Sequence, residues 1–209
     1  MSSRERRRLQ TRADLLASAR EVFAESGFAG ASLDEIARRA GFTKGALYGH
    51  FDNKDDLLLA LLDHETRALE QSITASARPG SGIAGLRMIA RGIAEALPRD
   101  RDWALAVTEF SLHAARQPEL AGHRREALRE SGSQLTAIFG SVLSRSLDER
   151  TVGPLAIAAI DGLMLQSALD DSLDLGQLVT IALERLITMT PDRSDDPSAC
   201  PPLDRPPLD

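Results

Sequence analysis

The sequence is poor in the residues that build most metal and thiol sites. Cys200 is the only cysteine among 209 residues, which excludes an intramolecular disulfide and a cysteine metal cluster. The four histidines, at positions 50, 64, 113 and 123, are scattered, and none has a second histidine four residues away, the spacing of a metal pair on a helix. We therefore expect no metal and no other cofactor.

Patterns typical of enzymes are also missing. No glycine-rich phosphate loop follows a strand, and no serine elbow is present. Asp63, His64 and Glu65 are adjacent, but neighbouring residues of a helix point in different directions, so we interpret them as a solvated face. The sequence argues against an enzyme.

No segment alternates polar and apolar residues over enough positions to form a half-buried strand. This predicts an all-α protein. Ser2 and Ser3 lead into arginines with no apolar run behind them, so the N-terminus is not a secretory signal. Together with the single cysteine, this favours a cytoplasmic location.

Charge is unevenly distributed along this acidic chain, whose net charge is −6. Residues 1–54 hold 10 Arg and Lys against 7 Asp and Glu, or +3, whereas residues 55–209 hold 15 against 24, or −9. The two lysines of the whole chain, Lys44 and Lys54, both lie in the basic part. A base-composition bias towards arginine explains their rarity but not their position. The basic end is expected to face a polyanion.

Residues 32–54 have the pattern of a helix-turn-helix. Ser32 and Glu35 have the spacing of a capping box, and apolar residues follow on one helical face. Gly41 then occupies the place where a left-handed residue ends a helix, and Thr43 is expected to cap a second helix up to Phe51. Two short helices joined by three or four residues are typical of the DNA-reading motif.

The second helix has two different faces. Leu47 and Phe51, four residues apart, are expected to face inward, while Lys44, Gly45 and Tyr48 are expected on the DNA side. Asn53 is expected to cap a third helix, with Lys54 as a phosphate contact beside its free amides. The candidate DNA-binding residues are Ser32, Thr43, Lys44, Gly45, Tyr48, His50 and Lys54.

These motifs, from about Thr11 to Leu62, resemble the DNA-binding domain of the TetR family of bacterial repressors. The matching segments are Phe23 to Phe28, then SLDEIARRAG, TKGALYGHF and NKDDLL. Gly49 departs from the family, which usually has a bulkier or polar residue between the tyrosine and the histidine, so base preference is not carried over. The resemblance implies a homodimer that binds a near-palindromic double-stranded operator and responds to a small apolar or amphipathic inducer.

Four domains are expected. Residues 1–10, with Arg4, Arg6, Arg7 and Arg8, form a flexible arm that either enters a minor groove or is simply disordered. Residues 11–54 form the helix-turn-helix domain, 55–190 a larger helical ligand-binding and dimerisation domain, and 191–209 a disordered proline-rich tail. The expected helices of the larger domain are 54–77, 83–97, 101–116, 119–147, a helix with Pro154 in its first turn that ends near Asp170, and 175–189.

The middle helices should enclose the inducer pocket that the resemblance implies. Large apolar and half-polar side chains are candidates, although each of them is also a normal core residue. Glu109 and Arg116, on the same helix, are expected to do no more than face solvent. The candidate pocket residues are Met88, Trp103, Phe110, His113, Phe139 and Met164.

The last two helices carry the expected dimer interface. Residues 152–169 are apolar almost all round, so this helix is either buried on several sides or spans a membrane. Asp161, Gln166 and its short length argue against a membrane span. Periodicity also allows both helices to close the core of one protomer, but the resemblance favours a four-helix interface. The candidate interface residues are Leu155, Ala159, Leu163, Leu178, Ala182 and Leu186.

The sequence thus predicts a ligand-responsive, homodimeric transcriptional repressor. The alternative is a helical dimeric ligand-binding protein that acts as an activator or has lost its DNA specificity. The presence of Lys44, Tyr48, His50 and Lys54 argues against a loss of DNA binding.

Overall fold

The computed structural model describes residues 2–97 and 100–189, which contain helices and no strand. This confirms the all-α fold. The expected tail at 191–209, with Cys200, lies outside the described residues. The helices are α1 (Ser3–Gly30), α2 (Leu33–Arg39), α3 (Lys44–Tyr48), α4 (Lys54–Ser76), α5 (Gly82–Ala96), α6 (Arg101–Ala115), α7 (Pro118–Leu143), α8 (Glu149–Leu169) and α9 (Leu175–Met189).

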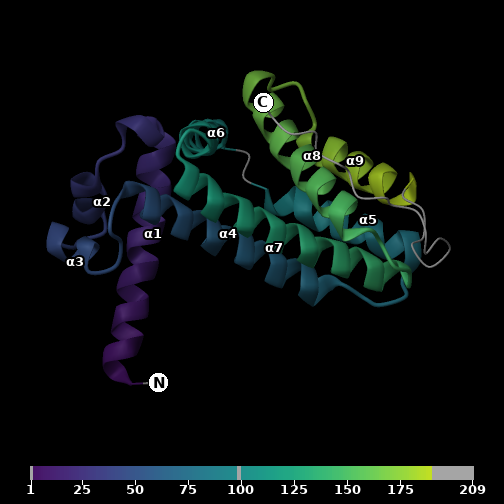
Figure 1. Ribbon diagram of the computed structural model, residues 1–209, viewed down its shortest axis with the longest axis horizontal. Helices are drawn as coiled ribbons and strands as arrows, with labels where there is room; N and C mark the ends of the chain where they lie inside the picture. Colours follow the sequence, from purple (N-terminus) through teal and green to yellow (C-terminus); the bar gives the residue numbers. More distant parts are fainter. Residues whose placement is uncertain (1, 98–99, 190–209) are drawn as a thin grey trace, which may run out of the picture.

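The helices form an N-terminal head and a longer body. Figure 1 shows α1, α2 and α3 at one end, with α4 running from them alongside α7 into the body. Helices α5, α8 and α9 lie at the opposite end, and α6 stands between the head and α8. The head thus presents α3 on the side away from the body.

Local sequence rules account for most helix ends. The side chains of Thr43 and Asn53 accept hydrogen bonds from the amides of Ala46 and Asp56, which confirms both as N-caps. Gly41 adopts the expected left-handed conformation, with φ of 75°. The expected capping box is wrong, because the Ser32 side chain makes no capping hydrogen bond. Glu35 instead accepts hydrogen bonds from Arg38 and Arg39.

Two helix boundaries in the body differ from expectation. Helix α7 ends at Leu143 because Ser144 turns left-handed, with φ of 52°. Pro154 lies inside α8 and not in its first turn, since Asp148 caps that helix by accepting a hydrogen bond from the Arg150 amide. Helix α9 has the expected bounds.

The N-terminal arm is helical from Ser3, which corrects the expectation of a flexible segment. The Ser2 hydroxyl accepts a hydrogen bond from the Glu5 amide, which caps the first turn. No glycine or proline interrupts residues 3–26, so the arm continues without a break into the buried part of α1.

Helix α6 belongs to the core of the head. Trp103 and Phe110, which are buried to 1% and 0% exposure, pack in one cluster with Phe23, Leu47 and the first turns of α4. A second cluster in the body joins α5, α7, α8 and α9 around Phe139. The hydrophobic core of the head therefore does not end at residue 54, because it also includes residues of α6.

The end of α1 is clamped by polar groups from α6 and α4. The chain breaks helical geometry at Gly27, with φ of 68° and ψ of 172°. The Glu109 carboxylate of α6 accepts hydrogen bonds from the amides of Phe28 and Ala29, at 2.8 and 3.4 Å. The Lys54 ammonium of α4 donates to the carbonyls of Ala29 and Ala31, at 3.1 and 3.3 Å. We call these contacts the backbone clamp.

Gly27→Ala should lower the free energy of unfolding by about 1–3 kcal/mol, because this backbone region is open essentially to glycine alone. A Cβ atom there would also lie 2.8 Å from Glu109 Oε2. Urea unfolding followed by circular dichroism measures the change. Gly92→Ala is the control, since it lies in α5 with no neighbour near its Cβ position and should stabilise the helix by about 0.5–1 kcal/mol. Equal stability of Gly27→Ala and wild type would show that the break is not constrained.

Candidate DNA-reading surface

Helices α2 and α3 are held in one rigid arrangement. The turn between them contains left-handed Gly41, and the Phe42 amide donates to the Ala37 carbonyl at 2.9 Å. Thr43 then caps α3. Leu47 and Phe51 are 0% and 2% exposed, as expected for the inward face. The turn, the Thr43 cap and the two buried anchors together fix which face of α3 points outward.

The outer face of α3 carries three of the expected DNA contacts. Lys44, Gly45 and Tyr48 are exposed, and 46% of Tyr48 is open to solvent. A Cβ atom at Gly45 would meet only the Thr43 hydroxyl, at 3.9 Å, so this stretch of backbone faces open space. A short helix with a bare backbone patch, a phenol and an ammonium group matches the dimensions and chemistry of a major groove.

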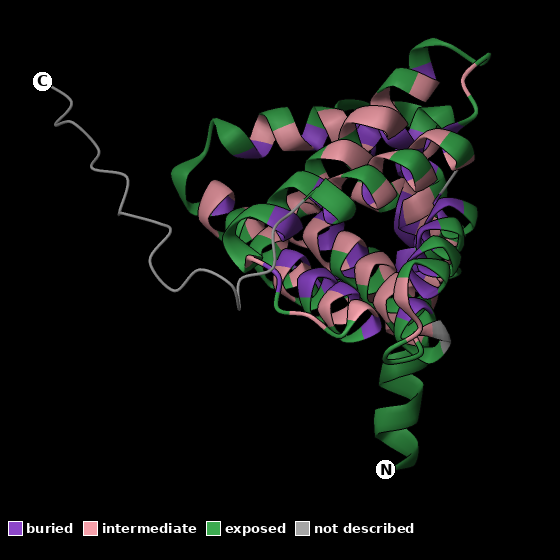
Figure 2. Ribbon diagram, turned by 90° about the vertical axis from the view of Figure 1, so that its right-hand side faces the viewer, coloured by how far each residue is buried: buried purple, intermediate pink, exposed green. Residues whose placement is uncertain are grey.

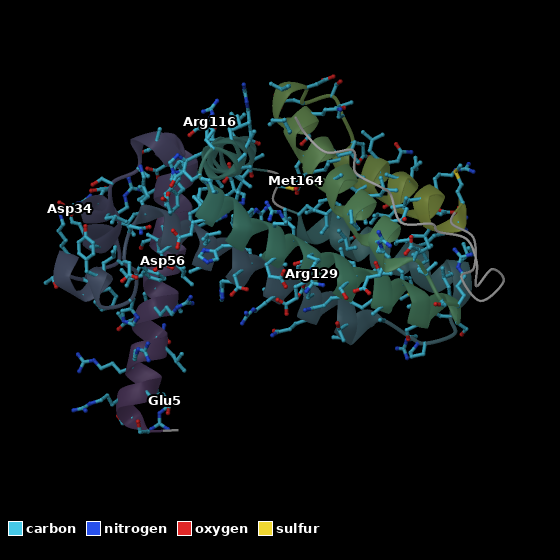
Figure 3. The ribbon with its side chains drawn as sticks, viewed as in Figure 1. Glu5, Asp34, Asp56, Arg116, Arg129 and Met164 are labelled. Carbon is cyan, nitrogen blue, oxygen red and sulfur yellow. The ribbon has the colours of Figure 1, made fainter. Side chains whose placement is uncertain are left out.

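Lys44 is not a free cation in the absence of DNA. Its Nζ lies 2.7 Å from Oδ1 of Asp34 on α2, and both side chains are more than half exposed. Asp34 lies at the outer edge of the head in Figure 3. The hydrogen bond and charge of Asp34 raise the pKa of Lys44. Because an exposed ion pair is weak, a DNA phosphate can replace Asp34.

His50 has an environment that favours the neutral ring. Its Nδ1 is buried without a hydrogen-bond partner in the described structure. Burial lowers the pKa of His50, and the charges of Arg8 and Arg12 lower it further. Both effects disfavour the charged form of the imidazole.

Ser32 and Thr43 are both exposed, but only Thr43 uses its hydroxyl to cap a helix. Lys54 is placed differently from the expectation of a phosphate contact. Its ammonium lies in the backbone clamp and 4.7 Å from the centre of the Phe28 ring. No sequence pattern indicates this position, because the acceptors are main-chain carbonyls at the end of another helix.

The expected pocket residues do not line one cavity in the described structure. Trp103 and Phe110 lie in the head core and Phe139 in the body core, while Met164 packs at the edge of the body core. Met88 is 59% exposed, so its assignment to a pocket is not supported, because most of its side chain is open to solvent. Large apolar residues mark core and pocket alike, and their spacing along a helix cannot separate the two.

His113 lies on a surface cleft that is lined by α6, the end of α1 and the start of α4. Its Nε2 is 3.1 Å from Oδ1 of Asp55, and Nε2 of Gln117 lies 2.7 Å from Nε2 of His113. The cleft has a volume of about 630 Å³. Its lining includes Lys54 and Glu109 of the backbone clamp, and Arg116, which Figure 3 shows at the end of α6. Glu109 is exposed as expected, but it also accepts hydrogen bonds from the end of α1, so the expectation that it does no more than face solvent is wrong.

The expected dimer residues lie on an incompletely covered apolar surface. Leu155 is 48% exposed, and the other five are partly buried. Helix α8 is long and apolar enough to span a membrane by length and composition, yet only 22% of that stretch is buried in the protomer. Length and composition of one such helix do not distinguish a membrane span from a helix that packs on protein.

No group of three metal-ligating side chains gathers in residues 2–97 and 100–189. The side chains that sequence reasoning missed are Asp34 and Glu109. Asp34 faces Lys44 across the α2–α3 turn, a contact that the helix-turn-helix pattern itself allows us to anticipate. Glu109 contacts a segment 81 residues away, for which the sequence carries no signal.

Both parts of the chain match known protein families. Residues 15–61 match the bacterial regulatory proteins of the tetR family, and residues 83–190 match the C-terminal domain of BetI-type transcriptional repressors. The regulator BetI of Paraburkholderia phytofirmans is 33% identical over 165 residues, which cover 76% of this chain and 82% of BetI. The regulator SrpR of Pseudomonas putida is 43% identical over 65 residues, which cover 31% of this chain and only 30% of SrpR.

Two solved structures align with most of this chain and share its fold. A transcriptional regulator from Rhodococcus is 26% identical, with 86% of this chain and 97% of that chain aligned at a TM-score of 0.67. FadR of Bacillus subtilis, solved with stearoyl-CoA, is also 26% identical, with 84% and 97% aligned at a TM-score of 0.64. The rigid α2–α3 unit, the helical body and these matches show that the chain belongs to the TetR family of bacterial regulatory proteins.

Proposed function

We propose that this protein is a dimeric, sequence-specific transcriptional repressor that a small-molecule ligand releases from its operator. The observation that carries the proposal is the outer face of α3, where Lys44, Gly45 and Tyr48 are exposed above the buried anchors Leu47 and Phe51. Each protomer would read one half of a near-palindromic operator in the major groove, in the cytoplasm where the DNA is.

Dimerisation is supported by the apolar surface of α8 and α9. Leu155, Ile181, Leu169 and Met189 are 48%, 47%, 73% and 80% exposed, and a second copy would remove them from water. Two helices from each protomer then form a four-helix interface, and the two-fold axis of the dimer matches that of a palindrome. Leu155, Ala159, Leu163, Leu178, Ala182 and Leu186 are the proposed interface residues.

Ligand response is supported by the position of α6. This helix packs in the head core through Trp103 and Phe110 and grips the end of α1 through Glu109. A small apolar or amphipathic ligand that binds among the helices of the body and displaces α6 would move the head with it. Its effect on DNA affinity equals its preference for the displaced state.

The proposal is tested by fluorescence anisotropy with the intergenic DNA upstream of the protein's own gene, in excess random-sequence competitor. If the proposal is correct, binding is saturable and resists the competitor. If the upstream DNA does not bind in this way, the purified protein is used to select a duplex from a random-sequence pool, and that duplex is titrated in its place. Failure of any sequence to be enriched would refute sequence-specific binding.

Tyr48→Ala should weaken operator binding by roughly tenfold per protomer, the size of one base-edge contact, and leave the dimer folded because the side chain is exposed. The same anisotropy titration measures the change, with circular dichroism as the check on folding. Ile83→Ala removes a similarly exposed apolar side chain from α5 in the body and should change nothing. If Tyr48→Ala binds the operator as tightly as wild type, the outer face of α3 is not the DNA-binding surface.

Asp34→Asn should strengthen binding to operator and random DNA alike, by about two- to fivefold, because it frees Lys44 and removes a negative charge next to the phosphates. Titrations on both DNAs at matched salt test this. Glu126→Gln on α7, which removes an exposed carboxylate of the body, is the control for net charge. A weaker complex with Asp34→Asn would mean that the ion pair positions Lys44 for DNA.

Lys54→Met should lower the free energy of unfolding by about 1–3 kcal/mol, since two carbonyls of the backbone clamp would be without their charged donor. The slope of log affinity against log salt should stay unchanged, because the ammonium already has partners within the protein. Urea unfolding and salt titrations measure the two effects. A slope shallower by about one unit, with stability unchanged, would instead establish a phosphate contact.

A further inference from the structure

The first turns of α1 form a projecting helical arm. Residues 3–10 are all exposed, and Figures 1 and 2 show this part of α1 extending beyond α2 and α3 and away from the body. At 1.5 Å per residue, the arm extends the head by about 12–15 Å. A helix that is exposed along its whole projecting length offers its side chains to a partner outside the protomer.

The arm is strongly basic. Residues 1–12 contain five arginines and one acidic residue, Glu5. The arm itself, residues 3–10, has a net side-chain charge of +3, and Arg12 at its base raises this to +4. Figure 3 shows nitrogen-tipped side chains on this part of α1 that extend to the side of the molecule where α3 lies.

Three of the arginines share the face of α1 that contacts the head. Arg4, Arg8 and Arg12 follow one another at intervals of four residues, which places them in one row along a helix. On the same face, further along α1, Leu15, Leu16 and Ala19 are buried in the head core. The face that packs on the head thus becomes an arginine row where the head ends.

Contacts place this row beside the DNA-reading helix. The Arg12 guanidinium lies 5.4 Å from the centre of the Phe51 ring, just after α3. Arg8 and Arg12 both act electrostatically on His50, whose pKa is lowered first by burial and then by these two charges. Arg8 and Arg12 therefore stand next to the end of α3, and Arg4 lies one turn further out.

We propose that the arginine row Arg4–Arg8–Arg12 binds the sugar–phosphate backbone of double-stranded DNA beside the half-site that α3 contacts. This inference rests on the proposed function and adds a second DNA-binding element to it. The row would give affinity without base preference, since phosphates carry no sequence information.

The dimensions favour phosphates over the minor groove. An α-helix with its side chains is about 10–12 Å wide, whereas the minor groove of B-DNA is about 6 Å wide, so a folded arm cannot enter it. Successive arginines of the row are about 6 Å apart along the helix, close to the distance that two phosphates of one strand rise along the DNA axis, about 3.4 Å each. The row can therefore follow one strand.

The test is the salt dependence of DNA binding by the full-length protein and by Arg4→Gln/Arg8→Gln/Arg12→Gln. The probes are a duplex selected by wild type from random-sequence DNA and a random-sequence duplex. Because the variant cannot neutralise three phosphates, the slope of log affinity against log salt should become shallower by about 2–3 units per bound protomer on both probes. The preferred sequence should stay the same.

Two further variants separate position from charge. Arg78→Gln/Arg125→Gln/Arg150→Gln makes the same change in charge at exposed sites of the body and should leave the slope unchanged. Leu9→Pro keeps all arginines but breaks the helix at a residue that is 52% exposed, and should remove a large part of the same slope. If Leu9→Pro keeps the wild-type slope of log affinity against log salt, the arginines do not need the helix, and a flexible arm replaces the helical row.

Other outcomes discriminate between this inference and the proposed function. Specific binding by wild type with an unchanged slope in the Arg4/Arg8/Arg12 variant would overturn the inference and leave the repressor proposal intact. A changed preference at one base position would overturn the phosphate role. Failure of wild type to select any sequence would overturn the proposed function and this inference together.

Discussion

The backbone clamp at residues 27–31 is the contact on which the two parts of the molecule depend. Its amides are held by the Glu109 carboxylate of α6 and its carbonyls by the Lys54 ammonium of α4. All of these hydrogen bonds involve a charged partner, and the two that are partly buried, Phe28 amide to Glu109 and Lys54 to the Ala31 carbonyl, are the ones least exposed to competition from water. Because α6 also packs in the head core, the end of α1 is held by a helix that lies more than 70 residues further along the chain.

The recognition helix α3 is held in place by the core of the head. Helix α3 has only five residues, too few to be stable alone, and it depends on Leu47, Phe51 and the Thr43 cap. These anchors rest on the same cluster that contains Trp103 and Phe110. The DNA-reading surface is thus supported by residues far along the chain, and displacement of α6 changes its support directly.

Sequence reasoning succeeded for the parts of the structure that depend on local rules. Periodicity predicted the helices, and the caps at Thr43 and Asn53, the left-handed Gly41 and the inward Leu47 followed from residue type and spacing. The reciprocal half of the capping box is absent because the Glu35 carboxylate has charged partners in Arg38 and Arg39, and nothing in the structure explains why the Ser32 hydroxyl makes no cap. The pocket residues could not be separated from core residues, since both are large and apolar. The roles of Glu109 and Lys54 depend on contacts between distant segments, which no local pattern encodes.

The clamp has a consequence for how this part of the sequence can change. Both of its charged side chains recognise main-chain groups, and those groups are the same whichever side chains occupy positions 28, 29 and 31. Substitutions at positions 29 and 31 therefore place no direct demand on residue 109 or residue 54, whereas the ring of Phe28 also contacts the Lys54 ammonium. Pairs of positions that change together in alignments reveal contacts between side chains, and a contact of this kind leaves no such trace. The link between α6 and the end of α1 can therefore stay constant while the side chains at positions 29 and 31 change.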